Sequence, residues 1–293
     1  MRGMIAFDLD GVLYTSEPFL GEAYREAIAN VNARRPGSFP RVPSTREILD
    51  HVGWPVPVIL ERLFPCIESA AVELLSAETL AVICTHVARR EGKLFPGVAE
   101  TLAALRTSGF LLAVASNGRG PYVETVLRAH DLKPHFVDLI TVDQAAGAVN
   151  ENPGEPPLVI PAKAGIHGAP TPPPHLDTRV RGYDGTESAS SHTGPTSCAK
   201  PAAAVTDKAD VLRAYLARHL LTSAEVIMVG DRASDVEAAA AVGCRFIGCD
   251  YGHGHRDEIE AAGPVVSSFD QLLQVVPDIV AAAAVLPNRG ARS

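Results

Sequence analysis

Residues 5–14 read IAFDLDGVLY, and this stretch decides the fold. An apolar run delivers two aspartates, Asp8 and Asp10, with a glycine directly after them. Side chains two positions apart on an extended segment point to the same side, so the two carboxylates share a small volume. Two unpaired anions there would repel each other. Either a cation lies between them, or one carboxyl is protonated, or both face water at the end of a strand.

Three apolar runs, at 4–7, 111–115 and 226–229, each stop at small polar residues. Short continuous apolar runs that alternate with helical stretches are typical of buried parallel strands. Two further runs, at 136–141 and 245–248, bring the expected sheet to five strands, a usual size. The sequence therefore predicts an α/β fold.

Chemically active side chains follow these runs. Ligands of open parallel sheets bind beyond the carboxyl ends of the strands. The residues expected at that edge are Asp8, Asp10, Ser116, Asn117, Asp231 and Asp235. Magnesium prefers oxygen ligands, which the carboxylates of Asp8, Asp231 and Asp235 can supply.

The segment SNG at 116–118 suits a different ligand. The hydroxyl of Ser116 and the backbone N–H groups around Asn117 and Gly118 can bind phosphoryl oxygens near a helix start. Together with the acidic residues, it predicts a site for a hard cation and a phosphoryl group.

Residues 16–94 have helical rather than strand character. Amphipathic patterns recur through this segment, and Ser44 with Glu47 has the spacing of a capping box. We expect a small helical domain at 16–94, inserted into a catalytic core formed by 1–15 and 95–293.

The overall charge narrows the class of partner. The chain has 26 basic and 34 acidic residues and a net charge of −8, which argues against nucleic acid or an anionic membrane surface as the main partner.

No long apolar segment stands at the start, so we expect a cytoplasmic protein. We expect it to be monomeric or homodimeric. The five cysteines form no C-x-x-C pair and are odd in number, which favours free thiols.

Four motifs in order resemble those of the haloacid dehalogenase-like hydrolases. They are DLDGVLY at 8–14, SNG at 116–118, KADVL at 208–212 and GDRASD at 230–235. A loop from Asp250, DYGHGHRDEIEAAG, is similar to one in phosphoglycolate phosphatase-like members. The resemblance implies a Rossmann-like parallel sheet with helices on both faces and an inserted α-helical cap domain.

The resemblance also implies residue roles. Asp8 would attack phosphorus and form an aspartyl-phosphate, while Asp10 would protonate the leaving oxygen and then activate water. Ser116 would hold a phosphoryl oxygen, with Asn117 and Gly118 also binding substrate. Lys208 would neutralise charge on Asp8 and the phosphoryl group.

A Mg²⁺ ion completes the implied site. Its ligands would be Asp8, Asp231 and the main-chain carbonyl of Asp10, with Asp235 acting through a water or from the outer sphere. The implied activity is magnesium-dependent hydrolysis of a small phosphorylated metabolite, similar to phosphoglycolate. Two alternatives stay open: a phosphosugar mutase of the same family, and a non-catalytic descendant that binds phosphate or a protein partner.

One region departs from the family. Residues 149–206 contain ten of the 23 prolines and show no sustained helical or strand period. We expect a disordered insertion within the core, similar to a genomic repeat read in frame; a partner-binding or gating loop is the alternative. The same region holds Lys200, followed by Pro201, a rival to Lys208 as the active-site lysine.

Overall fold

The computed structural model describes residues 2–65, 67–143 and 207–285. The chain forms two units, Met1–Glu151 with Thr206–Ser293, and Asn152–Val205; the described residues all belong to the first. The insertion expected at 149–206, and Lys200 within it, lie outside the described residues. The division into a core and a helical domain at 16–94 stays a prediction.

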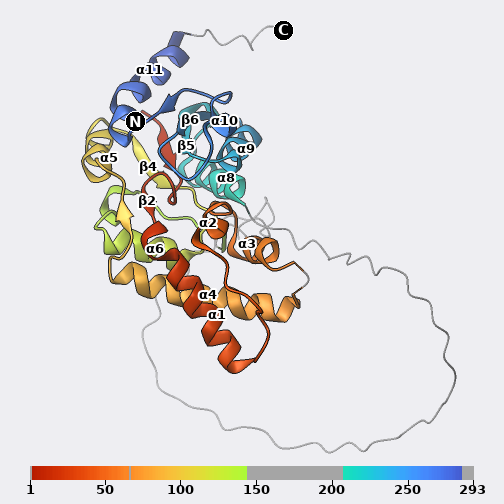
Figure 1. The fold of residues 1–293 in the computed structure, drawn as a ribbon. Helices are drawn as coiled ribbons and strands as arrows, with labels where there is room; N and C mark the ends of the chain where they lie inside the picture. Colours follow the sequence, from red (N-terminus) through yellow and green to blue (C-terminus); the bar gives the residue numbers. More distant parts are fainter. Residues whose placement is uncertain (1, 66, 144–206, 286–293) are drawn as a thin grey trace, which may run out of the picture. The chain divides into compact units, whose positions relative to one another are not determined.

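The unit is built on a five-stranded parallel sheet with the order β4-β1-β5-β6-β7 (Figure 1). The strands are β1 (Met4–Phe7), β4 (Leu111–Val114), β5 (Val226–Gly230), β6 (Arg245–Cys249) and β7 (Val265–Val266). Phe7 is in register with Val114 of β4 and Val229 of β5. The central strands therefore end at one level, and the α/β prediction is confirmed.

The strand expected at 136–141 is wrong. After the short 3₁₀ helix η1 (Lys133–His135), the Val137 N–H still donates to the Leu112 carbonyl of β4 over 3.0 Å. The Ile140 N–H then donates to the Tyr215 hydroxyl, over 2.8 Å, instead of continuing a ladder. The fifth strand is β7, which has two residues, too few to give a recognisable sequence pattern.

Helices cover both faces of this sheet because the side chains of its strands alternate. Ile5 and Phe7 join one hydrophobic cluster, whereas Met4 and Ala6 join another. The first cluster includes residues of α5 (Val98–Thr107), α6 (Gly120–Ala129), η3 (Phe269–Gln271) and α11 (Leu272–Val285). The second includes residues of α8 (Lys208–His219), α9 (Ala233–Val242) and α10 (Arg256–Ile259); η2 (Ser223–Glu225) precedes β5.

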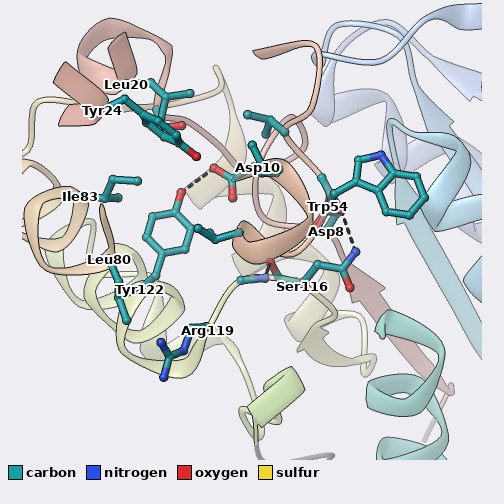
Figure 2. A pocket seen from close by; sticks show the side chains of 17 residues that line it. Asp8, Asp10, Leu20, Tyr24, Trp54, Leu80, Ile83, Ser116, Arg119 and Tyr122 are labelled. Atoms are coloured by element: carbon teal, nitrogen blue, oxygen red, sulfur yellow. Dashed lines mark hydrogen bonds between the residues drawn. The ribbon is translucent and has the colours of Figure 1, made fainter. Parts of the chain in front are cut away.

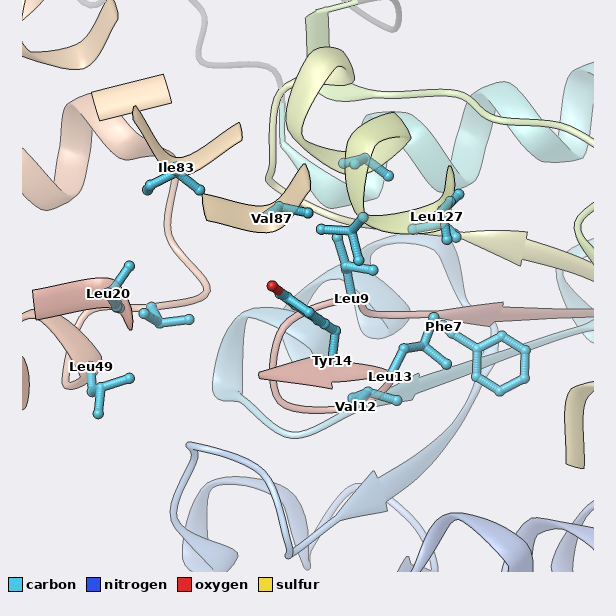
Figure 3. Close-up of a cluster of buried hydrophobic side chains, with 14 of the residues drawn as sticks. Phe7, Leu9, Val12, Leu13, Tyr14, Leu20, Leu49, Ile83, Val87 and Leu127 are labelled. Carbon is cyan, nitrogen blue, oxygen red and sulfur yellow. The ribbon is translucent and has the colours of Figure 1, made fainter. Parts of the chain in front are cut away.

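Four helices lie between the antiparallel strands β2 (Tyr14–Thr15) and β3 (Lys93–Leu94). They are α1 (Glu17–Arg34), α2 (Thr45–Leu49), α3 (Val56–Leu63) and α4 (Ser69–Ala88), called the cap helices below. The expected capping box is present: Ser44 Oγ accepts from the Glu47 N–H, and Glu47 Oε2 accepts from the Ser44 N–H. Figure 3 shows cap residues Leu20 and Val87 within the same apolar cluster as Phe7.

The helix α4 alone, among the described residues, is long and apolar enough to cross a membrane by length and composition. Its buried residues include Val72, Leu75, Thr79 and Ile83, and it packs against α1, as a core helix does. The three cysteines in the described part of the chain, Cys84, Cys244 and Cys249, are free thiols, as expected.

Candidate active site

Asp8 directly follows β1 and is buried. Its N–H donates to the Val229 carbonyl over 2.9 Å, which continues the pairing with β5. Its Oδ1 accepts from the Leu9 N–H at 2.7 Å and lies 3.0 Å from Lys208 Nζ. Its Oδ2 is buried and has no hydrogen-bond partner among the described residues. Burial raises the pKa of Asp8 well above its usual value, and Lys208 opposes this rise.

Lys208 is the first residue of α8 and is fully buried. The helix start is fixed by Asp207, whose side chain accepts from the N–H groups of Ala209 and Asp210. The ammonium contacts both Asp8 and Asp235. Burial alone would lower the pKa of Lys208, but the two carboxylates outweigh burial and raise this pKa, so the side chain stays charged. The structure thus places the expected Lys208 against Asp8.

Asp231 follows β5, and Asp235 lies in the first turn of α9. Asp235 Oδ2 accepts from the Asp231 N–H at 3.0 Å, while its Oδ1 contacts Lys208. Asp231 Oδ2 accepts from the N–H groups of His253 (2.7 Å) and Gly254 (3.1 Å). Burial and the nearby Asp235 raise the pKa of Asp231 to about 7, although those two backbone donors lower it.

The acidic residues fit a divalent cation. Carboxylate oxygens of Asp8, Asp231 and Asp235 lie within 4.8 Å of one another. Two buried oxygens, Asp8 Oδ2 and Asp231 Oδ1, have no partner among the described residues. Three carboxylates around one ammonium leave excess negative charge, and an oxygen-only donor set suits a hard ion such as Mg²⁺.

The Asp10 carboxylate is turned elsewhere. Its Oδ1 accepts from the Tyr122 hydroxyl at 2.5 Å (Figure 2). Burial raises the pKa of Asp10 to about 6, while Tyr122 and Lys208 act in the opposite direction. This carboxylate is not part of the cluster formed by those of Asp8, Asp231 and Asp235. The metal contact expected from Asp10 is made by its main-chain carbonyl, and it stays a prediction.

Tyr122 was not among the residues expected from the sequence. It stands in the first turn of α6, four positions after Gly118. A helix that starts directly after a strand-end loop presents its first turn to the same edge of the sheet. This position was the signal that could have identified Tyr122.

The SNG loop follows β4 as expected. Ser116 is buried, and its Oγ accepts from the Gly118 N–H at 3.0 Å. The space is tight, because a Cβ on Gly118 would lie 3.0 Å from the Tyr122 ring and 3.1 Å from Ser116 Oγ. Asn117 instead donates from Nδ2 to the Gly53 carbonyl at 2.7 Å, so its side chain holds the segment between α2 and α3.

Arg232 makes a second connection of this kind. Its Nη2 donates to the Leu49 carbonyl at 2.6 Å and its Nη1 to the Asp50 carbonyl at 3.5 Å. Arg232 follows Asp231 in sequence, as Asn117 follows Ser116. Two loops of the site therefore hold residues 49–53, an arrangement that no sequence motif indicated.

A pocket with an empty volume of about 690 Å³, including its opening to solvent, lies over these residues (Figure 2). It is lined by Asp8, Asp10, Ser16, Leu20, Tyr24, Val52, Gly53, Trp54, Val56, Ile59, Leu80, Ile83, Ser116, Asn117, Gly118, Arg119 and Tyr122. The carboxylates of Asp8 and Asp10 therefore line the same pocket as residues of the cap helices.

Two family models match the chain. The model for haloacid dehalogenase-like hydrolases matches residues 4–156, more than half of the chain. A second model, described as HAD-hydrolase-like, matches residues 198–275.

Curated relatives match over nearly their full length. The phosphoglycolate phosphatase of Vibrio vulnificus (strain YJ016) is 27% identical over 281 residues, with 93% of this chain and 95% of the relative covered. The phosphoglycolate phosphatase of Photobacterium profundum is 24% identical, with 93% and 94% covered.

Solved structures share the fold. A predicted phosphatase from Clostridium acetobutylicum matches with a TM-score of 0.63 and 18% identity, over 94% of this chain and 98% of that one. CbbY from Rhodobacter sphaeroides, solved in complex with phosphate, matches with a TM-score of 0.59 and 19% identity, over 93% and 96% of the two chains.

Proposed function

This chain belongs to the haloacid dehalogenase-like hydrolases, as a phosphoric monoester hydrolase, and we propose that it cleaves a small phosphomonoester with Mg²⁺ through a phosphorylated Asp8. The observation that carries this proposal is the pairing of Asp8 and Asp10 in one pocket, with the buried Lys208 ammonium 3.0 Å from Asp8. The expected cytoplasmic location and the monomeric or homodimeric state stay predictions.

In the first half of the reaction, a carboxylate oxygen of Asp8 forms a bond to phosphorus. The bond between phosphorus and the ester oxygen breaks, and Asp10 donates a proton to the departing alcohol. A pKa near 6 suits this role, because Asp10 can then both give and take a proton near neutral pH.

In the second half, water attacks phosphorus. Asp10, now ionised, accepts a proton from that water, the bond between phosphorus and Asp8 breaks, and inorganic phosphate leaves. The free carboxylate of Asp8 is regenerated. Atoms and charge therefore balance over the two halves without a further reactant.

Charge compensation supports both halves. Lys208 contacts Asp8 and Asp235 and offsets negative charge as the phosphoryl group arrives. Ser116 and the backbone of Gly118 supply polar groups in the same pocket. Asp8, Asp231 and Asp235 would hold Mg²⁺, which supplies positive charge to the transferring phosphoryl group when bound.

Hydrolysis of p-nitrophenyl phosphate tests this function. We expect release of phosphate that needs Mg²⁺, stops on chelation with EDTA and returns when Mg²⁺ is added in excess. Correctly folded protein without magnesium-dependent release would contradict the proposal. The same preparation is incubated with a sugar phosphate, because isomerisation without net release is what the mutase alternative requires.

A further inference from the structure

Building on the proposed function, we propose that the pocket takes an apolar alcohol group about as large as a phenylalkyl chain. The substrates are then phosphomonoesters of apolar alcohols, and the ester of a small hydroxy acid, such as phosphoglycolate, is a poor substrate. The inference rests on which residues face Asp8 and Asp10 across the pocket.

The far side of the pocket is apolar. The lining residues contributed by the cap helices and the segment that joins α2 to α3 include Leu20, Tyr24, Val52, Trp54, Val56, Ile59, Leu80 and Ile83. They come from α1, from the α2–α3 segment, from α3 and from α4 (Figure 2). Among the described lining residues, this side contributes no acidic or basic side chain. Apolar surface of this kind favours an apolar ligand, because covering it removes apolar area from water on both sides.

A carboxylate on the alcohol group would lack a partner. Arg119 is the basic residue among the described lining residues, and it is exposed, with its guanidinium turned away from Asp10 in Figure 2. Arg62 stacks its guanidinium on the Trp54 ring at 4.3 Å and does not line the pocket. Placing a carboxylate against an apolar wall without a cation is unfavourable, since the ion loses its hydration.

The pocket is also roomy for a two-carbon group. Its empty space is open to solvent, and eight apolar side chains from four segments line its far side, more than a two-carbon group can cover. Tyr24 is nearly fully buried, and its hydroxyl makes no hydrogen bond to another described residue. Figure 2 shows its ring directed toward Asp10, so the hydroxyl can donate to an acceptor on an otherwise apolar ligand.

Three alkyl phosphates test the inference with the wild-type protein and Mg²⁺. They are 2-phenylethyl phosphate, ethyl phosphate as the size control, and phosphoglycolate. We expect kcat/KM for 2-phenylethyl phosphate to exceed that of both others by about tenfold or more, the scale on which apolar pockets discriminate. A kcat/KM for phosphoglycolate equal to or above that of 2-phenylethyl phosphate would overturn the inference.

A charge placed in the wall gives a matched comparison. Leu80 lines the pocket from α4, whereas its neighbour Ala81 is exposed and does not line it. Leu80→Lys should lower kcat/KM for 2-phenylethyl phosphate by about tenfold and raise the value for phosphoglycolate. Ala81→Lys adds the same charge outside the pocket and should change neither of these two kcat/KM values. The inference would be overturned if both variants changed the preference for 2-phenylethyl phosphate over phosphoglycolate, measured by kcat/KM, to the same extent.

Binding separates this inference from the proposed function. Calorimetry compares 2-phenylethylphosphonate with phosphonoacetate, neither of which needs turnover. Absence of hydrolysis of p-nitrophenyl phosphate and of all three esters contradicts the proposed function; tighter binding of 2-phenylethylphosphonate would still support the pocket assignment. Tighter binding of phosphonoacetate would overturn the pocket assignment, and loss of that binding in Arg119→Met would assign Arg119 as the carboxylate partner.

Discussion

The Tyr122 hydroxyl donates a hydrogen bond to Asp10 Oδ1 across 2.5 Å, which ties the first turn of α6 to the loop after β1. Burial and the nearby Asp10 raise the pKa of Tyr122 well above its usual value, so the phenol keeps its proton and remains a donor. One oxygen of Asp10 is thereby held in place. The geometry points to Tyr122 as a positioning residue for the proposed proton transfer.

The substitution Tyr122→Phe tests that role. It removes the donor and keeps the ring, so we expect kcat to fall about tenfold to a hundredfold with little change in KM, the cost of a hydrogen bond to a charged group. The loss should be greater for an alkyl phosphate than for p-nitrophenyl phosphate, because a poor leaving group depends more on proton donation. Asp10→Asn, measured beside it, sets the upper limit of the effect. An equal loss on both esters would argue against a positioning role.

Asp8→Asn tests the nucleophile. The amide keeps the size and one acceptor oxygen of the side chain but cannot form the acyl phosphate, so turnover should fall by about a thousandfold or more. Because Asp8 is buried with a raised pKa, neutralising it should leave the melting temperature nearly unchanged. Asp257→Asn on the exposed surface of α10 is the control and should keep full activity. Substantial magnesium-dependent activity in Asp8→Asn would remove Asp8 from this role.

Magnesium should stabilise the folded protein. At a concentration about 100 times its Kd, a ligand that binds only the native state adds about 2.7 kcal/mol, which is a shift of several degrees in Tm. Asp231→Asn should abolish this shift while leaving the metal-free protein as stable or more stable, since one of three crowded carboxylates becomes neutral. Differential scanning calorimetry, with NaCl at equal ionic strength as the control, measures both. A full magnesium shift in Asp231→Asn would contradict the ligand assignment.

Arg232 should affect substrate capture rather than folding. Its guanidinium donates to the carbonyls of Leu49 and Asp50, so Arg232→Met keeps the aliphatic stem and loses both bonds. We expect kcat/KM to fall about tenfold, the equivalent of one to two modest hydrogen bonds, with Tm changed by no more than a few degrees. The matched control Arg213→Met removes an exposed pair with Asp210 on α8 and should leave kcat/KM unaltered. Equal values for the two variants would show that these bonds do not organise the pocket.

The sequence predicted the strands that position the site, because each central strand is a continuous apolar run that ends in a polar residue. Asp8, Ser116 and Asp231 were expected at one edge of the sheet, and the register of Phe7 with Val114 and Val229 places them there. Local pattern was sufficient for these residues because parallel strands align their ends.

What the sequence could not supply depends on contacts between distant segments. Tyr122 reaches Asp10 across 112 positions, and Arg232 reaches Leu49 across 183, through one hydrogen bond each. Neither contact has a periodicity that a sequence can display. The run at 136–141 has strand composition, but the Tyr215 hydroxyl takes the Ile140 N–H, so tertiary contact overrides local preference.

Two separate features require a glycine at position 11: its backbone conformation and its close approach to Asp231. Its φ is +89°, a conformation that costs an L side chain about 1 kcal/mol. A Cβ there would also lie 2.2 Å from Asp231 Oδ2, the oxygen that accepts from His253 and Gly254. Gly37 has a similar φ of +79° and nothing within 4 Å of its added Cβ, so Gly37→Ala reports backbone strain alone.

Gly11→Ala should therefore reduce both stability and activity more than Gly37→Ala does. In chemical denaturation, Gly37→Ala should lower the free energy of unfolding by about 1 kcal/mol, and Gly11→Ala by that amount plus the cost of moving the Asp231 carboxylate, a total of about 3 kcal/mol. In activity assays at saturating Mg²⁺, Gly37→Ala should match wild type, whereas Gly11→Ala should fall by about a hundredfold because the displaced carboxylate no longer meets Asp8 and Asp235 in one cluster. Equal stability and activity of the two variants would mean that the close approach of Gly11 to Asp231 has no part in building the site.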